Sequence, residues 1–154
     1  MQVLAFTVPG EPVGKGRPQF VPATGRRPHT PKKTAKYENL VALCFQSKYP
    51  DWAECRDMVE IDITAYFSIP QSWSKKKKAK AAANLIMPTK APDADNIAKM
   101  KDALNEIAWH DDAQVVEEHI HKRFSDRPRV EFTIKFFTDE DVMNQQMAEG
   151  ILRE

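Results

Sequence analysis

The sequence predicts a single mixed α and β domain, in which a mostly antiparallel or mixed sheet of about four strands is flanked by helices (α+β). Three observations predict this class. A chain of 154 residues is large enough for one domain with its own hydrophobic core. Its 42% hydrophobic and 29% charged residues are typical of a globular protein and not of a disordered one. Stretches with apolar residues at every second position alternate with stretches that repeat every three or four, which indicates interspersed strands and helices.

Four stretches with alternating apolar and polar side chains, or with a short apolar run, predict strands. Two of them, 114–124 and 129–137, are separated only by the turn sequence SDRP. We therefore expect these two strands to pair as a hairpin. The four predicted strands are residues 2–8, 58–69, 114–124 and 129–137.

Three stretches predict helices, at residues 31–48, 72–84 and 95–108. The first follows Thr30, an N-cap residue type, and begins with proline, which is favoured at the first helical position. The second is rich in lysine and alanine and has a thin apolar face, so we expect it at the periphery. The third carries isoleucine, methionine and leucine at helical spacing.

The charges are distributed unevenly, although the net charge is only +1. Residues 12–37 carry seven basic side chains and no acidic one, and residues 63–92 carry six lysines and no acidic side chain. Basic tracts of this kind are more often solvated surface than a binding site for a polyanion such as DNA. We interpret residues 1–138 as one domain and residues 139–154 as an acidic C-terminal tail or helix.

The two cysteines, Cys44 and Cys55, do not form a C-x-x-C pair. Neither a disulfide framework nor a cysteine zinc site is predicted, and we expect both thiols to be reduced. The N-terminus lacks the features of a signal peptide, and no segment approaches the ~20 apolar residues of a membrane span. We therefore expect no membrane partner and a cytoplasmic location.

Four aspartates flank the third predicted helix. Asp93 and Asp95 open it, and Asp111 and Asp112 follow its end. Carboxylates are the hard oxygen ligands that Mg²⁺ and Mn²⁺ need for phosphodiester chemistry. Aspartate is also favoured at helix N-caps and in turns, so the residues alone leave both interpretations open. A helix of about 12 residues is about 18 Å long, so Asp112 reaches the other acids only if the chain folds back.

Two other sites that use a D-x-D pattern fit poorly. An EF-hand that began at Asp93 would need glycine and glutamate where Ala98 and Leu104 stand. A phosphatase-like nucleophile would follow a buried strand, whereas the sequence PTKAP precedes Asp93. Lys99, one helical turn after Asp95, fits either a phosphate-stabilising role or a surface ion pair, and we expect it to pair with Asp102.

Three further residues fit either function or ordinary structure. Trp73 beside the lysine run 75–80 fits an apolar anchor better than a stacking platform for an unpaired base. His119 and His121 share one strand face, which fits a polar sheet surface better than a metal site because a third ligand is not evident.

The ordered set of motifs around these acids resembles the RusA family of Holliday junction resolvases. The set comprises D-A-D-N at 93–96, Lys99, D-A-L at 102–104 and W-H-D-D-A-Q-V at 109–115. The resemblance extends to GKGRPQF and TPKKTAKYE near the front and spans most of residues 3–137. It implies that Asp93, Asp95 and Asp112 are catalytic metal ligands, with Asp111 as a further ligand and Lys99 as the catalytic lysine. The stretch between Lys99 and D-A-L is one residue shorter than is usual, so Lys101 is the alternative lysine.

The resemblance implies an endodeoxyribonuclease that depends on Mg²⁺ or Mn²⁺ and resolves branched DNA by paired symmetric nicks, with metal-activated water as the nucleophile. A homodimer is also expected, since a four-way junction has two-fold symmetry and each chain offers one acid cluster. The alternatives are a junction-binding protein without catalysis and a nuclease specific for flaps or single strands. The basic residues expected to contact DNA phosphates are Lys15, Arg17, Arg26, Arg27, Lys32 and Lys33.

Overall fold

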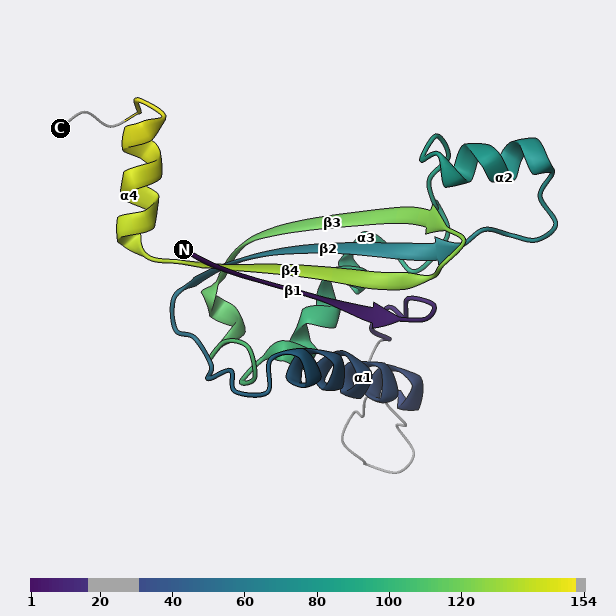
Figure 1. The fold of residues 1–154 in the computed structure, drawn as a ribbon. Coiled ribbons are helices and arrows are strands. Elements are labelled where there is room, and N and C mark those ends of the chain that lie inside the picture. Colours follow the sequence, from purple (N-terminus) through teal and green to yellow (C-terminus); the bar gives the residue numbers. More distant parts are fainter. Residues whose placement is uncertain (17–30, 152–154) are drawn as a thin grey trace, which may run out of the picture.

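The computed structural model describes residues 1–16 and 31–151, and its centre is a four-stranded sheet with the order β1-β4-β2-β3 (Figure 1). β4 is antiparallel to both of its neighbours, whereas β2 and β3 are parallel. The sheet is therefore mixed, and the predicted α+β class is confirmed. The strands are β1 (Gln2–Pro9), β2 (Met58–Ser68), β3 (Val115–Ser125) and β4 (Arg129–Phe137).

One face of the sheet is covered by helices, and two further helices project from the ends of the sheet (Figure 1). The covering layer is α1 (Lys32–Lys48) together with α3 (Ala94–Ala98), which continues directly as the 3-10 helix η2 (Lys99–Leu104). α2 (Lys75–Ala82) and α4 (Asp139–Ala148) project at opposite ends. None of the helices in the described residues is long and apolar enough to span a membrane.

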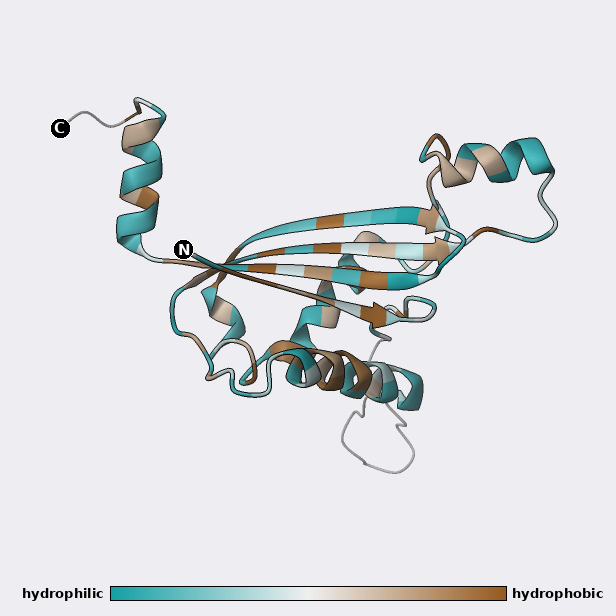
Figure 2. Cartoon of the chain, in the orientation of Figure 1, coloured by the Kyte–Doolittle hydropathy of each residue, from teal (hydrophilic) through white to brown (hydrophobic). Residues whose placement is uncertain are grey.

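The core forms where the apolar face of the sheet meets α1. Every second side chain of β2, from Val59 to Ala65, is fully buried, and the hydropathy along the strands alternates in the same way (Figure 2). Phe6 of β1 pairs with Phe132 of β4, and their rings stack with centroids 4.7 Å apart. Phe45 of α1 packs edge-on against Phe6 at 5.5 Å. The sheet and α1 therefore share one continuous apolar layer.

The expected hairpin between the last two strands is wrong, because β2 lies between β3 and β4. The apolar side chains of β4, such as Phe132 and Ile134, are buried, whereas no side chain of β3 is fully buried. The apolar strand therefore takes an interior place and the polar strand takes the edge. The link from Ser125 to Arg129 reaches about 13 Å, enough to cross two strand spacings of about 9.6 Å in total.

The predicted helix 95–108 is shorter and tighter than expected. Its α-helical part ends at Ala98, η2 ends at Leu104, and Asn105 is already extended. Glu106 then adopts the left-handed conformation, with φ 62°, and the chain turns back. Glutamate is uncommon in this conformation, so its presence does not predict a turn there. The lysine-rich helix is peripheral as predicted, with the Ser74 hydroxyl accepting the Lys77 amide at 3.2 Å.

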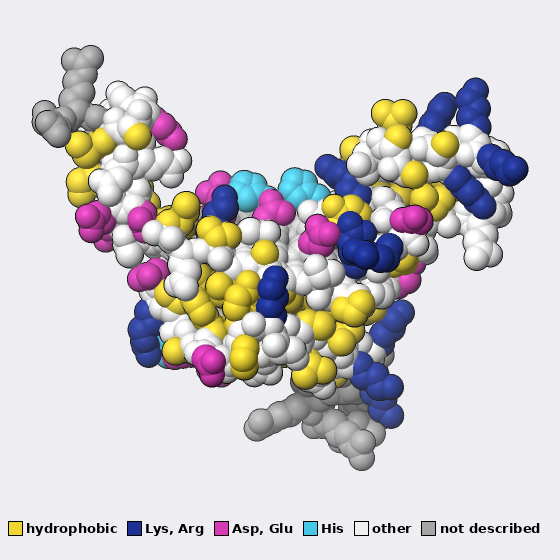
Figure 3. Space-filling view, viewed as in Figure 1, with side chains coloured by type: hydrophobic (Ala, Val, Ile, Leu, Met, Phe, Trp, Pro, Cys, Tyr) yellow, Lys and Arg dark blue, Asp and Glu magenta, His cyan; other side chains and the backbone are white. Residues whose placement is uncertain are grey.

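The other face of the sheet is polar, and its charged side chains pair across strands (Figure 3). His119 Nε2 lies 3.4 Å from Glu60 Oε1 and 3.2 Å from Glu117 Oε1. Of the residues that the structure describes, only these three bring three potential metal-ligand atoms within 4.8 Å of one another. Lys135 Nζ also contacts Glu60 Oε2 at 2.9 Å, so we interpret this group as an ion-pair network. His121 makes a similar contact with Asp62 at 3.4 Å.

Glu60→Gln is expected to alter how stability depends on pH. The hydrogen bond from Lys135 holds the pKa of the Glu60 carboxyl below its usual value, and partial burial opposes this. A carboxyl with a lowered folded-state pKa stabilises the fold above its unfolded-state pKa, and this contribution is lost as the pH falls through the folded-state value. Urea unfolding from pH 6 to pH 3 should show a stability advantage of wild type, at most about 1 kcal/mol, that disappears in acid. Parallel stability profiles for the two proteins would contradict this.

Candidate metal and DNA site

The first two predicted acids lie at the start of α3. Asp93 is the N-cap residue, and its Oδ1 accepts the Asn96 amide at 2.9 Å. Asp95 follows in the first turn with 75% of its side chain exposed, and its Oδ2 lies 3.0 Å from Lys99 Nζ. The cap and the ion pair suggested by the sequence are therefore both present. Each of these contacts uses one oxygen of its carboxylate. The second oxygen of Asp93 and of Asp95 takes part in neither contact.

A cavity of about 470 Å³ adjoins this helix end. It is lined by Asp93, Asp95 and Lys99 and also by Asp102, for which a different contact was predicted. Asp102 was expected to pair with Lys99, but this pairing is wrong, since Lys99 pairs with Asp95. Asp102 Oδ2 instead contacts Lys15 Nζ at 2.7 Å. The cavity is lined by Lys15, Gly16, Asp93, Asp95, Asn96, Lys99 and Asp102.

Lys15 connects the front segment of the chain to the acids. Its ammonium also lies 3.3 Å from Glu38 Oε1 of α1. Partial burial alone would lower the pKa of Lys15, but the hydrogen bond and charge of Asp102, with a further contribution from Glu38, raise it above its usual value. Lys15 is therefore held as a cation between two carboxylates at the edge of the cavity.

The backbone around Lys15 is packed closely on the start of α3. The Lys15 amide donates to the Asn96 carbonyl at 3.2 Å, and the Gly16 amide donates to Thr34 Oγ1 at 3.0 Å. A Cβ on Gly14 would lie 2.5 Å from Pro92 Cβ, which is closer than such atoms approach in real proteins. Glycine at this position therefore permits the segment to lie against the residues that precede Asp93.

Gly14→Ala is expected to push this segment away from α3 and to misplace Lys15. Overpacking of this kind costs about 1–3 kcal/mol. We expect a moderate fall in thermal stability and a larger fall in DNA binding and cleavage, measured on the same preparation. Gly10→Ala is a matched control for added bulk, because a Cβ there meets no atom within 4 Å, although its positive φ of 92° adds strain. Equal activity losses in the two variants would contradict a specific role for the Gly14 contact.

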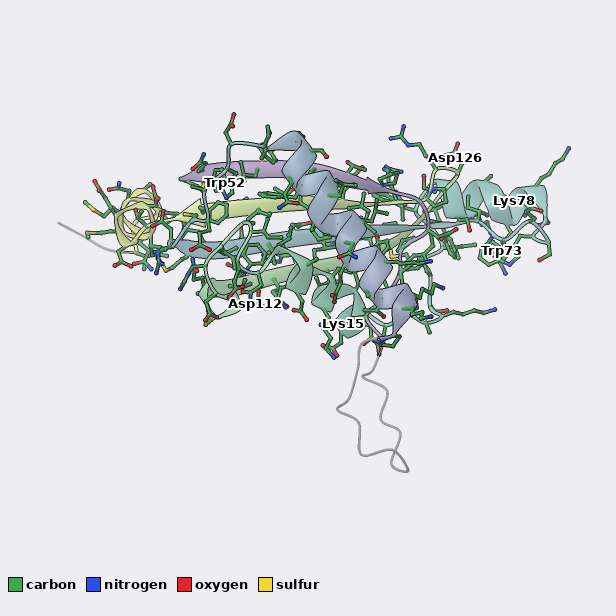
Figure 4. All side chains as sticks on the ribbon, turned by 90° about the horizontal axis from the view of Figure 1, so that it is seen from below. Lys15, Trp52, Trp73, Lys78, Asp112 and Asp126 are labelled. Atoms are coloured by element: carbon green, nitrogen blue, oxygen red, sulfur yellow. The ribbon has the colours of Figure 1, made fainter. Side chains whose placement is uncertain are left out.

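Asp112 lies at the first position of the short 3-10 helix η3 (Asp112–Gln114), and Figure 4 shows it along the same edge of the molecule as Lys15. Trp109, whose side chain is fully buried, donates from Nε1 to Asp112 Oδ1 at 2.8 Å. Burial raises the pKa of the Asp112 carboxyl, the Trp109 hydrogen bond opposes this, and the charge of Asp102 adds to the increase. The tryptophan therefore fixes one oxygen of Asp112 and leaves the other available.

The acids form a row rather than one tight cluster. Asp102 shares the cavity with Asp93 and Asp95, and its charge also acts on Asp112. After the turn at Glu106 the chain brings Asp112 close enough to Asp102 for their charges to interact, although Asp112 does not line the cavity. Asp102 thus lines the cavity beside the predicted acids, which the sequence interpretation did not anticipate. Its only signal was its place in the D-A-L motif.

Asp111 and Lys101 have other contacts. Asp111 Oδ1 accepts the Ala113 amide at 2.8 Å, so this carboxylate caps η3, and its role as a metal ligand stays a prediction. Lys101 has only 16% of its side chain exposed and forms an ion pair with Glu118 of β3. Lys99, in contrast, lines the cavity with Asp93 and Asp95. The arrangement favours Lys99 over Lys101 as the lysine that meets a phosphate there.

The basic residues predicted to contact DNA are only partly described. Lys15 adjoins the acids, as shown above, and its ammonium is already paired with carboxylates. Lys32 and Lys33 are exposed in the first turn of α1. Arg17, Arg26 and Arg27 lie outside the described residues.

The chemistry of the donor set fits Mg²⁺ or Mn²⁺. All of the candidate ligand atoms are carboxylate oxygens, which suit hard cations, and neither histidine nor cysteine lines the cavity. Mg²⁺ is commonly bound by one or two carboxylates together with water and substrate phosphates, so three converging acids are not required. Asp93 and Asp95 would hold such an ion, whereas Asp112 lies outside the cavity that these two acids line.

Comparison with known proteins identifies the family of the chain. Residues 9–135 match the family described as Endodeoxyribonuclease RusA. The chain is also similar to the uncharacterized protein YqaN of Bacillus subtilis (strain 168), with 40% identity over 139 residues that cover 88% of this chain and 97% of that protein. The family match includes every acid described above and most of the sheet. The chain therefore belongs to the RusA family of Holliday junction resolving endodeoxyribonucleases.

Proposed function

We propose that this protein is a Mg²⁺-dependent endonuclease that nicks branched DNA at the row of acids formed by Asp93, Asp95, Asp102 and Asp112. The observation that carries the proposal is the shared cavity, in which two carboxylates of α3 lie beside Lys99 and the Lys15–Asp102 pair. Anionic ligands for a cation and cationic side chains for a phosphate therefore lie next to each other. Because DNA is the proposed substrate, the proposal also places the protein in the cytoplasm.

The side chains would divide the work as follows. Asp93 and Asp95 would hold the cation, which when bound would supply charge stabilisation at the phosphate and lower the pKa of a bound water. Lys99 leaves Asp95 and donates to a nonbridging phosphate oxygen, where its charge stabilises the negative charge that builds up. Asp112 is oriented by the hydrogen bond from Trp109. Its other oxygen would accept a hydrogen bond or a proton from the attacking water. Lys15 holds Asp102 at the edge of the site.

We further propose that two copies of the chain act together. A four-way junction has two-fold symmetry, and its resolution requires two nicks on strands of like polarity. Each chain offers one row of acids, so a two-fold dimer supplies one nick from each subunit. Sedimentation should show a dimer for the protein alone and two chains per junction for the complex. A single chain per junction would oppose the dimer without opposing the nuclease activity.

The direct test is cleavage of end-labelled DNA by the purified protein with Mg²⁺, with Mn²⁺ and with EDTA. We expect metal-dependent nicks at symmetric positions on a four-way junction and much slower cleavage of linear duplex of the same sequence. Junction binding without nicks under any metal would instead support a binding protein without catalysis. Faster cleavage of flaps or single strands than of the junction would support a nuclease of that other specificity.

A further inference from the structure

A second cavity, of about 530 Å³, lies beside the lysine-rich arm and is separate from the cavity at the acids. Aromatic and aliphatic side chains from several segments form its walls, among them Phe67, Trp73, Ile86, Met87 and Phe124. Its volume falls in the range of pockets that hold small organic groups, about 300–1,000 Å³. Neither the acids nor the proposed chemistry uses this cavity.

The aromatic wall is built by contacts between separate elements. Trp73, which precedes α2, packs edge-on against Phe124 of β3 with ring centroids 5.2 Å apart. Lys77 Nζ lies 3.9 Å from the centroid of the Trp73 ring. Trp73 therefore anchors α2 as the sequence predicted, and it also contributes its ring to the cavity. Flat aromatic walls of this kind favour a flat apolar group.

The surroundings of the cavity are strongly cationic. Residues 63–92 carry six lysines without an acidic residue, and five of these lysines lie on α2, which projects into solvent (Figures 1 and 3). Lys90, which lines the cavity, accepts at its carbonyl a hydrogen bond from Lys122 Nζ of β3 at 2.7 Å. The one acidic residue in the wall, Glu11, accepts the Ser68 amide at 3.0 Å. An occupant should therefore combine a flat apolar group with negative charges on either side.

The two cavities are joined through short stretches of chain. Ala91 lines the aromatic cavity, and Asp93, two residues later, lines the acid cavity at a distance of at most about 7 Å along the chain. Glu11 and Lys15 connect the two walls in the same way from the front segment. Figure 4 shows Trp73 and Lys78 at the α2 end of the molecule, on the right of the view, with Lys15 lying nearer to them than Asp112 does. A DNA strand leaving the acids toward α2 would pass this cavity.

We infer that the cavity lined by Trp73 and Phe124 binds one unpaired nucleobase of the DNA, while the lysines of α2 contact the adjoining phosphates. This inference rests on DNA being the substrate and goes beyond it by assigning a recognition site. Bases in a duplex have both faces covered by their neighbours, so only an unpaired base exposes a face for the aromatic wall. Base stacking is interrupted at a branch point, so the cavity would make the protein sensitive to a base that leaves its pair there.

Binding measurements in an Asp95→Asn background, which separates binding from cleavage, test this. The probes are an oligothymidylate and a strand of equal length made of abasic sites, which has the same phosphates without bases. We expect oligothymidylate to bind more tightly than the abasic strand. Trp73→Ala should reduce the ratio of the two affinities about tenfold, in line with stacking on one aromatic side chain. Trp73→Phe should retain most of it. Lys78→Ala is the matched control, because Lys78 lies on α2 outside this cavity. This substitution should lower the affinity for both probes by the same factor.

A photocrosslinking experiment on otherwise unaltered protein covers the case in which Trp73→Ala disturbs α2. Oligothymidylate with one 4-thiothymidine should crosslink to Trp73 or Phe124, and crosslinks confined to other parts of the chain would overturn the inference. Equal binding of the two probes by the Asp95→Asn protein would overturn it as well. Base-dependent binding at Trp73 without any DNA cleavage by the wild type would oppose the proposed nuclease function alone.

Discussion

Asp95→Asn and Asp112→Asn are each expected to slow junction cleavage by on the order of a thousandfold, because both substitutions remove a negative charge that would face the cation or its water. DNA binding should remain or become tighter, since the loss of an acid weakens repulsion of phosphate. The measurement is a single-turnover cleavage rate with saturating protein, alongside the junction affinity measured in Ca²⁺ or EDTA.

The structure provides a control for these two variants. Asp139→Asn removes an acid of the same type from the first turn of α4, far from the cavity, and should cleave like wild type. Thermal unfolding should also separate the contribution of Asp95 to stability from its proposed role in cleavage. Its exposed ion pair with Lys99 contributes only a few tenths of a kcal/mol, about 0.3–0.5 for this spacing, so the variant should remain folded. Wild-type cleavage rates for Asp95→Asn and Asp112→Asn would rule out this site.

Trp109→Ala is expected to have the largest effect on stability, a loss of about 3–5 kcal/mol. The side chain is fully buried, and the backbone around it bridges to Cys55 and Asn105. Trp109→Phe keeps much of the volume but removes the donor to Asp112 Oδ1, which should cost about 1–3 kcal/mol. We expect its cleavage rate to fall even at temperatures where circular dichroism shows it fully folded, because Asp112 is no longer held in place.

Trp52→Phe is the matched variant for that comparison. Trp52 also donates from Nε1, to the Ala108 carbonyl at 2.9 Å, and it packs on Phe136 at 5.3 Å, but it does not contact Asp112. It should lose stability while the folded fraction cleaves normally. If Trp109→Phe and Trp52→Phe reduced cleavage by the same factor per folded molecule, the proposed positioning of Asp112 by Trp109 would be wrong.

The order of the strands shows where pattern-based prediction reaches its limit. The alternation along 58–69 and 129–137 identified β2 and β4 because each buries one face of side chains. The same pattern does not specify which strands are neighbours in the sheet. The short turn after β3 favoured a hairpin with β4, although a third strand can lie between them. β2 inserts between β3 and β4 because the apolar pair β2 and β4 fills the sheet interior, which leaves the polar β3 at the edge.

The site shows the same limit at the level of single residues. The motif order predicted Asp93, Asp95, Lys99 and Asp112 as site residues, and the fold places the first three around one cavity. The partner of Asp102 could not be predicted, because Lys15 is 87 residues away in the sequence and reaches it only when the front segment packs on α3. The left-handed turn at Glu106 was equally hidden, since glutamate carries no turn preference.

The sequence by itself determined the fold class, most of the helices and strands, and the resemblance to the RusA family, because these depend on local periodicity and on the order of motifs along the chain. The tertiary structure alone decided the strand order, the contact of Lys15 with Asp102, and the position of Asp112 against Trp109. These features depend on side chains that meet across long stretches of chain, and local preferences do not encode such meetings. The row of acids is therefore specified in part by its motifs and in part by the turn and the front segment that bring its members together.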